Sequence, residues 1–436
     1  MANTLAFDGL IGLLHGQLEQ IPDHRTGKNT TYTIKDAGLA AFAVFFIQSP
    51  SFLAHQRQMF RAKGQSNAES FFGIEQIPSD NQIRNLLDPI TRDQLSPLFW
   101  TILEALEQSG QLDSSRVLDD NSLISLDGTR YFSSPKISCK NCSQSTTGEG
   151  KTTYFHDVIL PVLVTPGSKR VIMLEPEFIV PQDGHDKQDC EQTAAKRWLR
   201  RNAKHFTPGQ ATVLGDDLYC KQPFCELVLE KEFNFILVCK PDSHPALYEW
   251  VDFTGVQERV VRHWNGRYGE IYTYRYVHHV PLRRGDDALF VDWCELTITH
   301  ETSGEILYRN AFATNYLVTE KNVEAIVEAG RARWKSENES HNVLKTKGYH
   351  LEHNFGHGKE NLASILLTLN LLAFLYHTIL GMVSVKYQLL RKELVARKTF
   401  FNDIRALTRY LYFPGWEAML KFMIVGLELP IPPDPG

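Results

Sequence analysis

Carboxylates follow two apolar segments of the chain, at the point where each segment ends. Asp127 comes after SLISL and before a glycine, and Asp216 and Asp217 come after ATVLG. Short runs of Val, Ile and Leu that end in Gly or Asp are typical of buried strands. A single strand-end Asp is commonly a turn or capping residue. Two of them at neighbouring strand ends would lie at the sheet edge where ligands usually bind.

A further pair of acids, Glu337 and Glu339, lies in the segment GRARWKSENESHNVLK, whose pattern predicts a helix. At about 100° per residue, Glu339 points about 200° away from Glu337, whereas Arg333 and His341 share the face of Glu337. Two strand acids and one helix acid can converge on Mg²⁺, which prefers oxygen ligands. Two such ions stabilise the attacking and leaving oxygens of a displacement at phosphorus. The constellation therefore predicts metal-dependent phosphoryl transfer.

The order of strand Asp, strand Asp, β-rich segment and helix Glu resembles that of bacterial insertion-sequence transposases of family four. In that family an RNase H-like core carries a DDE triad, and the last motif is Y-x2-R-x3-E-x6-K, often centred on R-W-x-x-E. Arg333, Trp334 and Glu337 match R-W-x-x-E. The sequence departs from the motif twice, because Gly330 stands at the Tyr position and Lys345 comes one residue late. In a regular α-helix, Lys345 lies about 80° around the axis from Glu337.

The resemblance implies a cut-and-paste DNA transposase with a catalytic, metal-binding triad of Asp127, Asp216 and Glu337. The triad would hold two Mg²⁺ ions, for which Mn²⁺ could substitute. Asp216 is selected over Asp217 because Tyr219 follows it as in the family's D-R-G-Y motif. The DNA phosphates would be bound by residues of the Glu helix and its end, namely Arg333, His341, Lys345 and Lys347.

The same resemblance implies the partners: double-stranded DNA with terminal inverted repeats, target DNA, and a second copy of the chain in a synaptic homodimer. No membrane is implied. Two other functions fit the same fold. One is a metal-dependent nuclease without strand transfer, which shares the chemistry and differs only in making no joined products. The other is a non-catalytic DNA-binding protein derived from a transposase, which predicts broken acidic positions, whereas all three acids are present.

The elements that must position these residues predict an α/β fold: an RNase H-like core of mixed sheet and flanking helices, with a β-rich insertion and helical ends. Apolar residues recur at helical spacing in Thr33–Ile47, Ser51–Ala62 and Thr91–Gln108, and apolar–polar alternation marks the insertion. The expected divisions are a helical DNA-end-binding region (1–115), the first part of the core (116–248), the β insertion (249–319), the second part of the core with the Glu helix (320–395), and a helical region with a Pro-rich tail (396–436).

Composition is that of a globular protein, with 43% apolar and 22% charged residues. The net charge of −5 gives no global attraction for DNA, but phosphate contacts need only local basic patches. Two such patches occur, at 196–204 and 331–347, although each by itself is more typical of a solvated helix face. The apolar stretch Leu362–Val383 contains Asn370 and His377, which favours a buried core helix over a membrane span.

The cysteine pattern predicts reduced thiols. Seven Cys residues, an odd number, and the absence of a signal-peptide pattern at the N-terminus indicate a cytoplasmic protein, associated with the nucleoid through DNA. Cys139 and Cys142 have zinc-knuckle spacing, but a structural zinc site needs four ligands. The other close pair, Cys220 and Cys225, has an atypical spacing. Free buried thiols are therefore the expectation.

Two His-containing segments are not expected to bind metal. The loop 182–191 carries His185, Asp186 and Asp189 before a predicted helix, and a solvated loop with helix capping explains it. The segment HLEHNFGHGKEN resembles a metal cluster only in its number of histidines. Its glycines indicate a turn, which in the resembled family could contact DNA.

Overall fold

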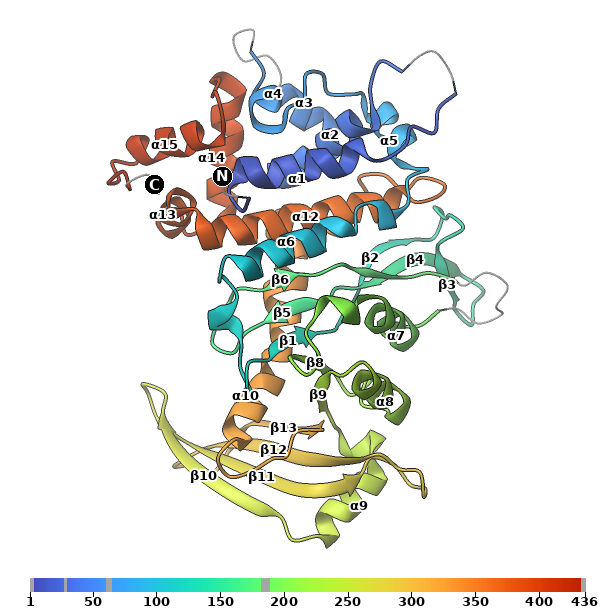
Figure 1. Cartoon of the computed structure of the whole chain (residues 1–436), viewed down its shortest axis with the longest axis vertical. Coiled ribbons are helices and arrows are strands. Elements are labelled where there is room, and N and C mark those ends of the chain that lie inside the picture. The colour runs from blue at the N-terminus through green and yellow to red at the C-terminus, as the bar shows by residue number, and fades with distance from the viewer. Residues whose placement is uncertain (1–3, 27–29, 60–64, 182–188, 433–436) are drawn as a thin grey trace.

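Helices from the two ends of the chain pack together at one end of the molecule, above the sheet in Figure 1. The structure, a computed structural model, describes residues 4–26, 30–59, 65–181 and 189–432. The N-terminal helices are α1 (Phe7–Glu19), α2 (Ile34–Phe46), α3 (Phe52–Met59), α4 (Asn67–Phe72), α5 (Asp80–Leu87) and α6 (Pro97–Gln108). The C-terminal helices are α12 (Leu362–Val383), α13 (Val385–Glu393), α14 (Arg397–Tyr410) and α15 (Trp416–Gly426). The helical character predicted for both ends is confirmed.

Helix α12 joins these helices to the rest of the fold. By length and composition it could cross a membrane, but 89% of its most apolar window is buried inside the protein. It packs against α2, where Phe42 and Tyr376 meet edge to face at 5.1 Å, and against β6 of the central sheet. The prediction of a core helix is confirmed.

The central sheet has nine strands in the order β10-β11-β12-β13-β9-β8-β1-β5-β6. Strands β1, β8 and β9 are parallel neighbours, and every other pairing in the sheet is antiparallel. The five strands of this sheet that come first along the chain are β1 (Ser122–Ser125), β5 (Val162–Val164), β6 (Ile172–Met173), β8 (Ala211–Gly215) and β9 (Asn234–Val238). The predicted α/β class with a mixed sheet is confirmed.

The predicted β insertion is antiparallel, and it continues the central sheet through the pairing of β13 with β9. It consists of β10 (Gln257–Trp264), β11 (Gly269–Pro281), β12 (Phe290–His300) and β13 (Ile306–Thr314). Gly266 and Gly304 have φ values of 93° and 71° in its turns, a conformation that favours glycine. A second, four-stranded sheet contains β2 (Gly128–Ser134), β3 (Ser143–Thr146), β4 (Thr152–Ile159) and β7 (Glu177–Ile179).

The remaining helices lie beside the central sheet (Figure 1). They are α7 (Glu191–Asn202), α8 (Gln222–Glu230), α9 (Pro245–Phe253), α10 (Val323–Arg331) and α11 (Asn342–Thr346), with a 3₁₀ turn at Ala332–Trp334 and a π-helix at Ser336–His341 between the last two. Other 3₁₀ turns are Arg92–Gln94, Asp113–Ser115, Ala203–His205 and Pro241–Ser243. Helix α7 buries Ala194, Trp198 and Leu199, whereas Cys190 is its exposed N-cap residue and precedes the first turn.

Candidate active site

Asp127 and Asp216 lie at matched ends of adjacent parallel strands. Strands β1 and β8 pair in register up to Ser125 opposite Leu214, and the backbone N–H of Leu126 continues the ladder by donating to the carbonyl of Leu214 at 2.9 Å. Two residues after the pair of Ser125 and Leu214, each chain segment reaches its Asp. The prediction that the two acids follow neighbouring strands is confirmed.

The Asp127 carboxyl is surrounded by other acids. Its side chain is 15% exposed, and burial raises its pKa to about 7, with further upward contributions from Glu337, Glu191 and Asp216. Arg333 acts in the opposite direction and lowers this pKa. A buried carboxyl among like charges is a site where a divalent cation would restore the ionised form. The donor set of carboxylate oxygens fits Mg²⁺ or Mn²⁺.

Glu337 lies in the π-helix and acts electrostatically on Asp127. Its Oε1 accepts a hydrogen bond from Nη1 of Arg333 at 3.1 Å, and its side chain is 53% exposed. The turn before it is fixed to the sheet, because Ser125 Oγ donates to the carbonyl of Arg333 at 3.3 Å. Among the described residues, the three carboxylates do not form a group whose oxygens all lie within 4.8 Å of one another. Sharing of one or two cations by Asp127, Asp216 and Glu337 stays a prediction.

The π-helix changes the predicted position of Lys345. An i→i+5 turn contains one residue more than an α-helical turn, so residues after it are turned back by about 100°. The rotation about the helix axis from Glu337 to Lys345 therefore changes from about 80° in one direction to about 20° in the opposite direction. By this ideal geometry, the π-helix would bring Lys345 close to the Glu337 face, whereas a regular α-helix would place it well off that face. The π-helix accommodates the extra residue that separates this sequence from the family spacing.

The second departure from the motif also has a local cause. A Cβ at Gly330 would lie 2.8 Å from Phe312 Cε1 and 2.9 Å from Ile236 Cγ2. The last turn of α10 packs directly on β9 and β13 at this point. A tyrosine side chain has no room at this position.

His341 has a different environment from the one predicted. It was expected to bind DNA phosphate, yet it is buried, and its Nδ1 lies 3.5 Å from Oδ2 of Asp127. Burial lowers its pKa to about 4, and the charges of Lys345 and Arg333 lower it further. A neutral imidazole carries no charge with which to attract a phosphate. His341 instead packs beside the Asp127 carboxylate.

The structure gives Asp217 a separate task. Its Oδ1 accepts from the backbone N–H of Lys240 at 2.8 Å, and its carboxylate also accepts from the Ser243 hydroxyl and lies 3.3 Å from His244 Nδ1. Asp217 therefore holds the loop after β9. This observation supports the choice of Asp216 as the site residue.

Glu191 is a site residue that sequence reasoning missed. Its Oε1 accepts from the backbone N–H of Gly128 at 3.1 Å and from the Tyr219 hydroxyl at 2.6 Å. One carboxylate at the start of α7 thus binds the residue after Asp127 and the tyrosine three residues after Asp216. Burial is the largest cause of its raised pKa. The only signal in the sequence was an acid in the first turn of a predicted helix, which is common at helix N-termini.

The basic residues divide into structural and accessible ones. In the patch 196–204, Arg197 and Arg201 form ion pairs with Glu177, at 3.1 and 2.8 Å. These two side chains therefore stabilise the fold and are not free to bind phosphate. Lys345 forms an ion pair with Glu352 at 3.0 Å on the surface, and such a pair contributes little to the stability of the fold. Lys347 is exposed after α11. His185 and Asp186 lie outside the described residues.

Two groups of Cys and His side chains have ligand atoms within 4.8 Å of one another: Cys139, Cys142, His156 and His357, and separately Cys220, Cys239 and His244. Cys139 and Cys142 were expected to be free buried thiols; both are free of disulfide bonds but only half-buried, and they lie beside His156 and His357. They are joined by histidines rather than by Cys220 and Cys225.

Comparisons of the chain with models of known protein families and with curated proteins give no match. The candidate site is therefore interpreted from its own geometry and from the motif that it resembles.

Proposed function

We propose that this protein is a DDE-type DNA transposase with an RNase H-like core. The observation that carries the proposal is the arrangement of Asp127 and Asp216 at matched ends of parallel strands, with Arg333 and Glu337 acting electrostatically on Asp127 from a helix. Three segments far apart in the sequence thus carry acids of which two, Asp216 and Glu337, act electrostatically on the third, Asp127.

The sheet supports the same proposal. The first strand, β1, is flanked by antiparallel β5 on one side and by parallel β8 on the other, so its acid follows an inner strand of the sheet and not an edge strand. The β-rich insertion falls between the second acid and the helix acid, as in the family that the motif resembles. The compensating π-helix supports it further, because Lys345 returns to the Glu337 face.

Asp127, Asp216 and Glu337 would hold the divalent cations. When bound, such cations activate the attacking water or 3′-OH and stabilise the leaving oxygen. Glu191 and His341 would keep the two strand acids oriented through Gly128, Tyr219 and Asp127 itself.

Arg333 would bind the substrate rather than the cation. Its guanidinium donates to Glu337 and acts electrostatically on Asp127, and its side chain is 19% exposed, so it could exchange its contact with Glu337 for the oxygens of a phosphate. Lys345 and Lys347 extend this positive edge along the same helix. The N-terminal helices and β10–β13 are the proposed surfaces for the terminal inverted repeats, and two copies of the chain would hold the two DNA ends.

The test is a cleavage and strand-transfer assay on duplexes that carry the DNA bordering the gene, with Mg²⁺ or Mn²⁺. Glu337→Gln should lower the cleavage rate on the order of 10²–10³-fold, while its matched control Glu339→Gln retains activity. Asp216→Asn and Asp217→Asn form a second matched pair, in which only the first should lose the metal-dependent step without loss of folded structure.

The products decide between the alternatives. Joined products from a 3′-OH donor indicate a transposase, whereas cleavage without joined products indicates a nuclease. Binding of the duplexes without any cleavage would indicate a non-catalytic DNA-binding protein. Equal activity of Glu337→Gln and wild type would refute the proposed triad.

A further inference from the structure

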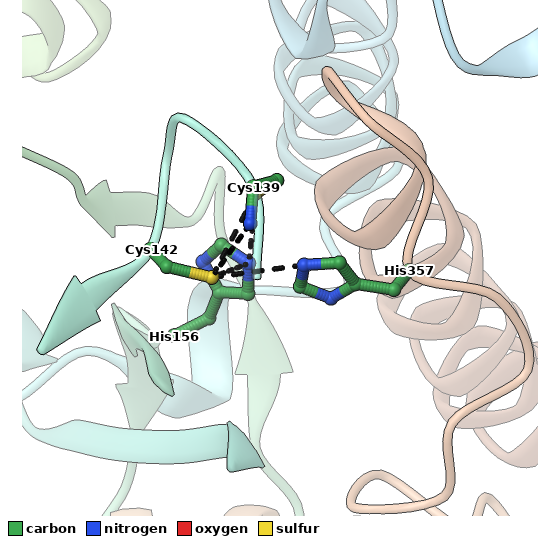
Figure 2. A group of neighbouring side chains, drawn as sticks. All are labelled: Cys139, Cys142, His156 and His357. Carbon is green, nitrogen blue, oxygen red and sulfur yellow. Dashed lines mark hydrogen bonds between the residues drawn. The ribbon is translucent and has the colours of Figure 1, made fainter. Parts of the chain in front are cut away.

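Four side chains from three separate segments converge beside the second sheet (Figure 2). Cys139 and Cys142 lie in the turn between β2 and β3, His156 lies on β4, and His357 lies in the loop before α12. The two sulfurs are 3.8 Å apart. Nε2 of His156 lies 3.5 Å from Cys139 Sγ and 3.4 Å from Cys142 Sγ, and Nε2 of His357 lies 3.6 Å from Cys142 Sγ.

These separations are the edges of a zinc tetrahedron. With Zn–S bonds of about 2.3 Å and Zn–N bonds of about 2.05 Å, tetrahedral angles place two sulfurs about 3.8 Å apart and a sulfur and a nitrogen about 3.6 Å apart. The observed distances agree with these values to within about 0.2 Å. Two sulfurs at 3.8 Å are also far outside the length of a disulfide bond.

From this geometry we infer that the protein binds a structural zinc ion through Cys139, Cys142, His156 and His357. Two thiolates and two imidazoles form a ligand set typical of structural zinc, and sulfur ligands exclude Mg²⁺ and Ca²⁺ as the preferred ions. Four protein ligands complete the tetrahedron and leave no open position for a substrate. The inference does not depend on the proposed transposase function.

Hydrogen bonding among the four groups explains the cluster less well. Both thiols approach the same nitrogen of His156, which has one lone pair to offer. His156 is buried among these groups, and a neutral imidazole is the form that binds metals. The surroundings also suit a closed site: Tyr131 stacks on His156 with ring centroids 5.5 Å apart, and Phe132 packs on His357 at 4.2 Å.

The zinc ion would connect the two halves of the candidate active site. The cysteine turn already contacts the loop of His357, because Asn141 Nδ2 donates to the carbonyl of Glu360 at 2.7 Å and Lys140 pairs with the Glu360 carboxylate at 3.5 Å. Strand β2 begins at the residue after Asp127, and the His357 loop follows the helix of Glu337. A tetrahedral ion here fixes the second sheet against α12, and so restricts movement between the segments that carry these two acids.

The second Cys/His group lacks these features. Cys220, Cys239 and His244 supply three ligand atoms, and Nε2 of His244 is already bonded to the carbonyl oxygen of Cys220. It therefore serves as an internal control, because it is a buried Cys/His group with three ligand atoms among the described residues and not four.

The experiment is metal analysis of the purified full-length chain. Wild type should carry about one zinc per chain after dialysis, released when a mercurial reagent blocks the thiols. Cobalt(II) in place of zinc should give the visible absorption of a tetrahedral, thiolate-bound ion. Cys142→Ser and His357→Asn should each lose the bound zinc, whereas Cys190→Ser and Cys220→Ser should retain it.

Wild-type protein alone can refute the inference. Folded protein from zinc-supplemented cells with far less than one zinc per chain, and without the tetrahedral cobalt spectrum, would overturn it. So would zinc that persists in Cys142→Ser but is lost in Cys220→Ser. If either ligand variant does not fold, the zinc content and the cobalt spectrum of the wild-type protein still decide whether the zinc site exists.

Discussion

Deletion of Asn338 tests the π-helix of the candidate site. Asn338 is exposed in the middle of Ser336–His341, so its removal should convert the i→i+5 turn to an ordinary α-helical turn. The residues before and after the deleted position would then stay on the same faces of the helix as in the wild-type protein. The loss is the exposed side-chain hydrogen bond with Asn342 at 3.1 Å, which contributes less than about 1 kcal/mol.

A regular helix would respond differently. Without a π-turn, removal of one residue rotates everything after it by about 100°, and Leu344, which is fully buried, would leave the core. Such a loss costs about 2–5 kcal/mol. For a chain of 436 residues, each 1 kcal/mol shifts the Tm by about 1 °C. Deletion of exposed Glu104 in α6 is the matched control, because it rotates the buried Leu106 out of register.

The assay is thermal melting of wild type and both deletions, followed by cleavage of the DNA ends. The Asn338 deletion should melt within about 1 °C of wild type, whereas the Glu104 deletion should melt several degrees lower. The Asn338 deletion should also retain cleavage. It leaves six residues between Glu337 and Lys345, which is the spacing of the family motif E-x6-K. A fall in Tm as large as that of the Glu104 deletion would refute the claim that the π-helix accommodates one extra residue.

Four other predictions concern single side chains. Glu191→Ala should lower cleavage about 10–100-fold, while Glu191→Gln, whose amide oxygen can still accept both hydrogen bonds, should rescue it; equal loss in both variants would show that the charge itself is needed. Gly330→Ala should lower stability by about 1–3 kcal/mol in denaturant melts, since its Cβ would lie 2.8 Å from Phe312, whereas Gly381→Ala meets nothing within 4 Å and should be neutral or stabilising. Burial lowers the pKa of His55 to about 3, so below pH 6.5 the unfolded chain binds a proton that the folded chain does not. The unfolding free energy should therefore fall by about 1.4 kcal/mol per pH unit as the pH drops from 6.5, and His55→Gln should remove that part of the slope. Arg333→Lys should impair cleavage despite the retained charge, because an ammonium cannot contact a phosphate in two-point fashion, and a rate near that of wild type would contradict this role.

Local patterns in the sequence identified most elements of this protein. Apolar runs ending in acids marked β1 and β8, helical spacing marked α2 and α12, and alternation marked β10–β13. These features are decided over a few residues by burial periodicity, which is why a single sequence is enough to find them. Asp127 and Asp216 were found for the same reason, since each follows the end of an apolar strand, whereas Glu337 was selected by the motif R-W-x-x-E.

The tertiary structure decided what depends on contacts between distant segments. The matched register of Asp127 and Asp216 comes from pairing of two strands that are far apart in the chain, and no local pattern fixes it. The orienting role of Glu191 likewise requires α7 to lie against both acid-bearing turns. The π-helix was invisible because its sequence has ordinary helical composition, and only packing of Leu344 and His341 shows the extra residue.

The Cys/His cluster shows the difference most clearly. The sequence displayed Cys139 and Cys142 as half of a zinc site, but the nearest candidates for the other half were cysteines with the wrong spacing. Folding brings in His156 from the paired strand β4 and His357 from the loop before α12, more than 200 residues away. A four-ligand site is a property of positions in space, and its two histidines are ordinary residues until the second sheet packs against that loop.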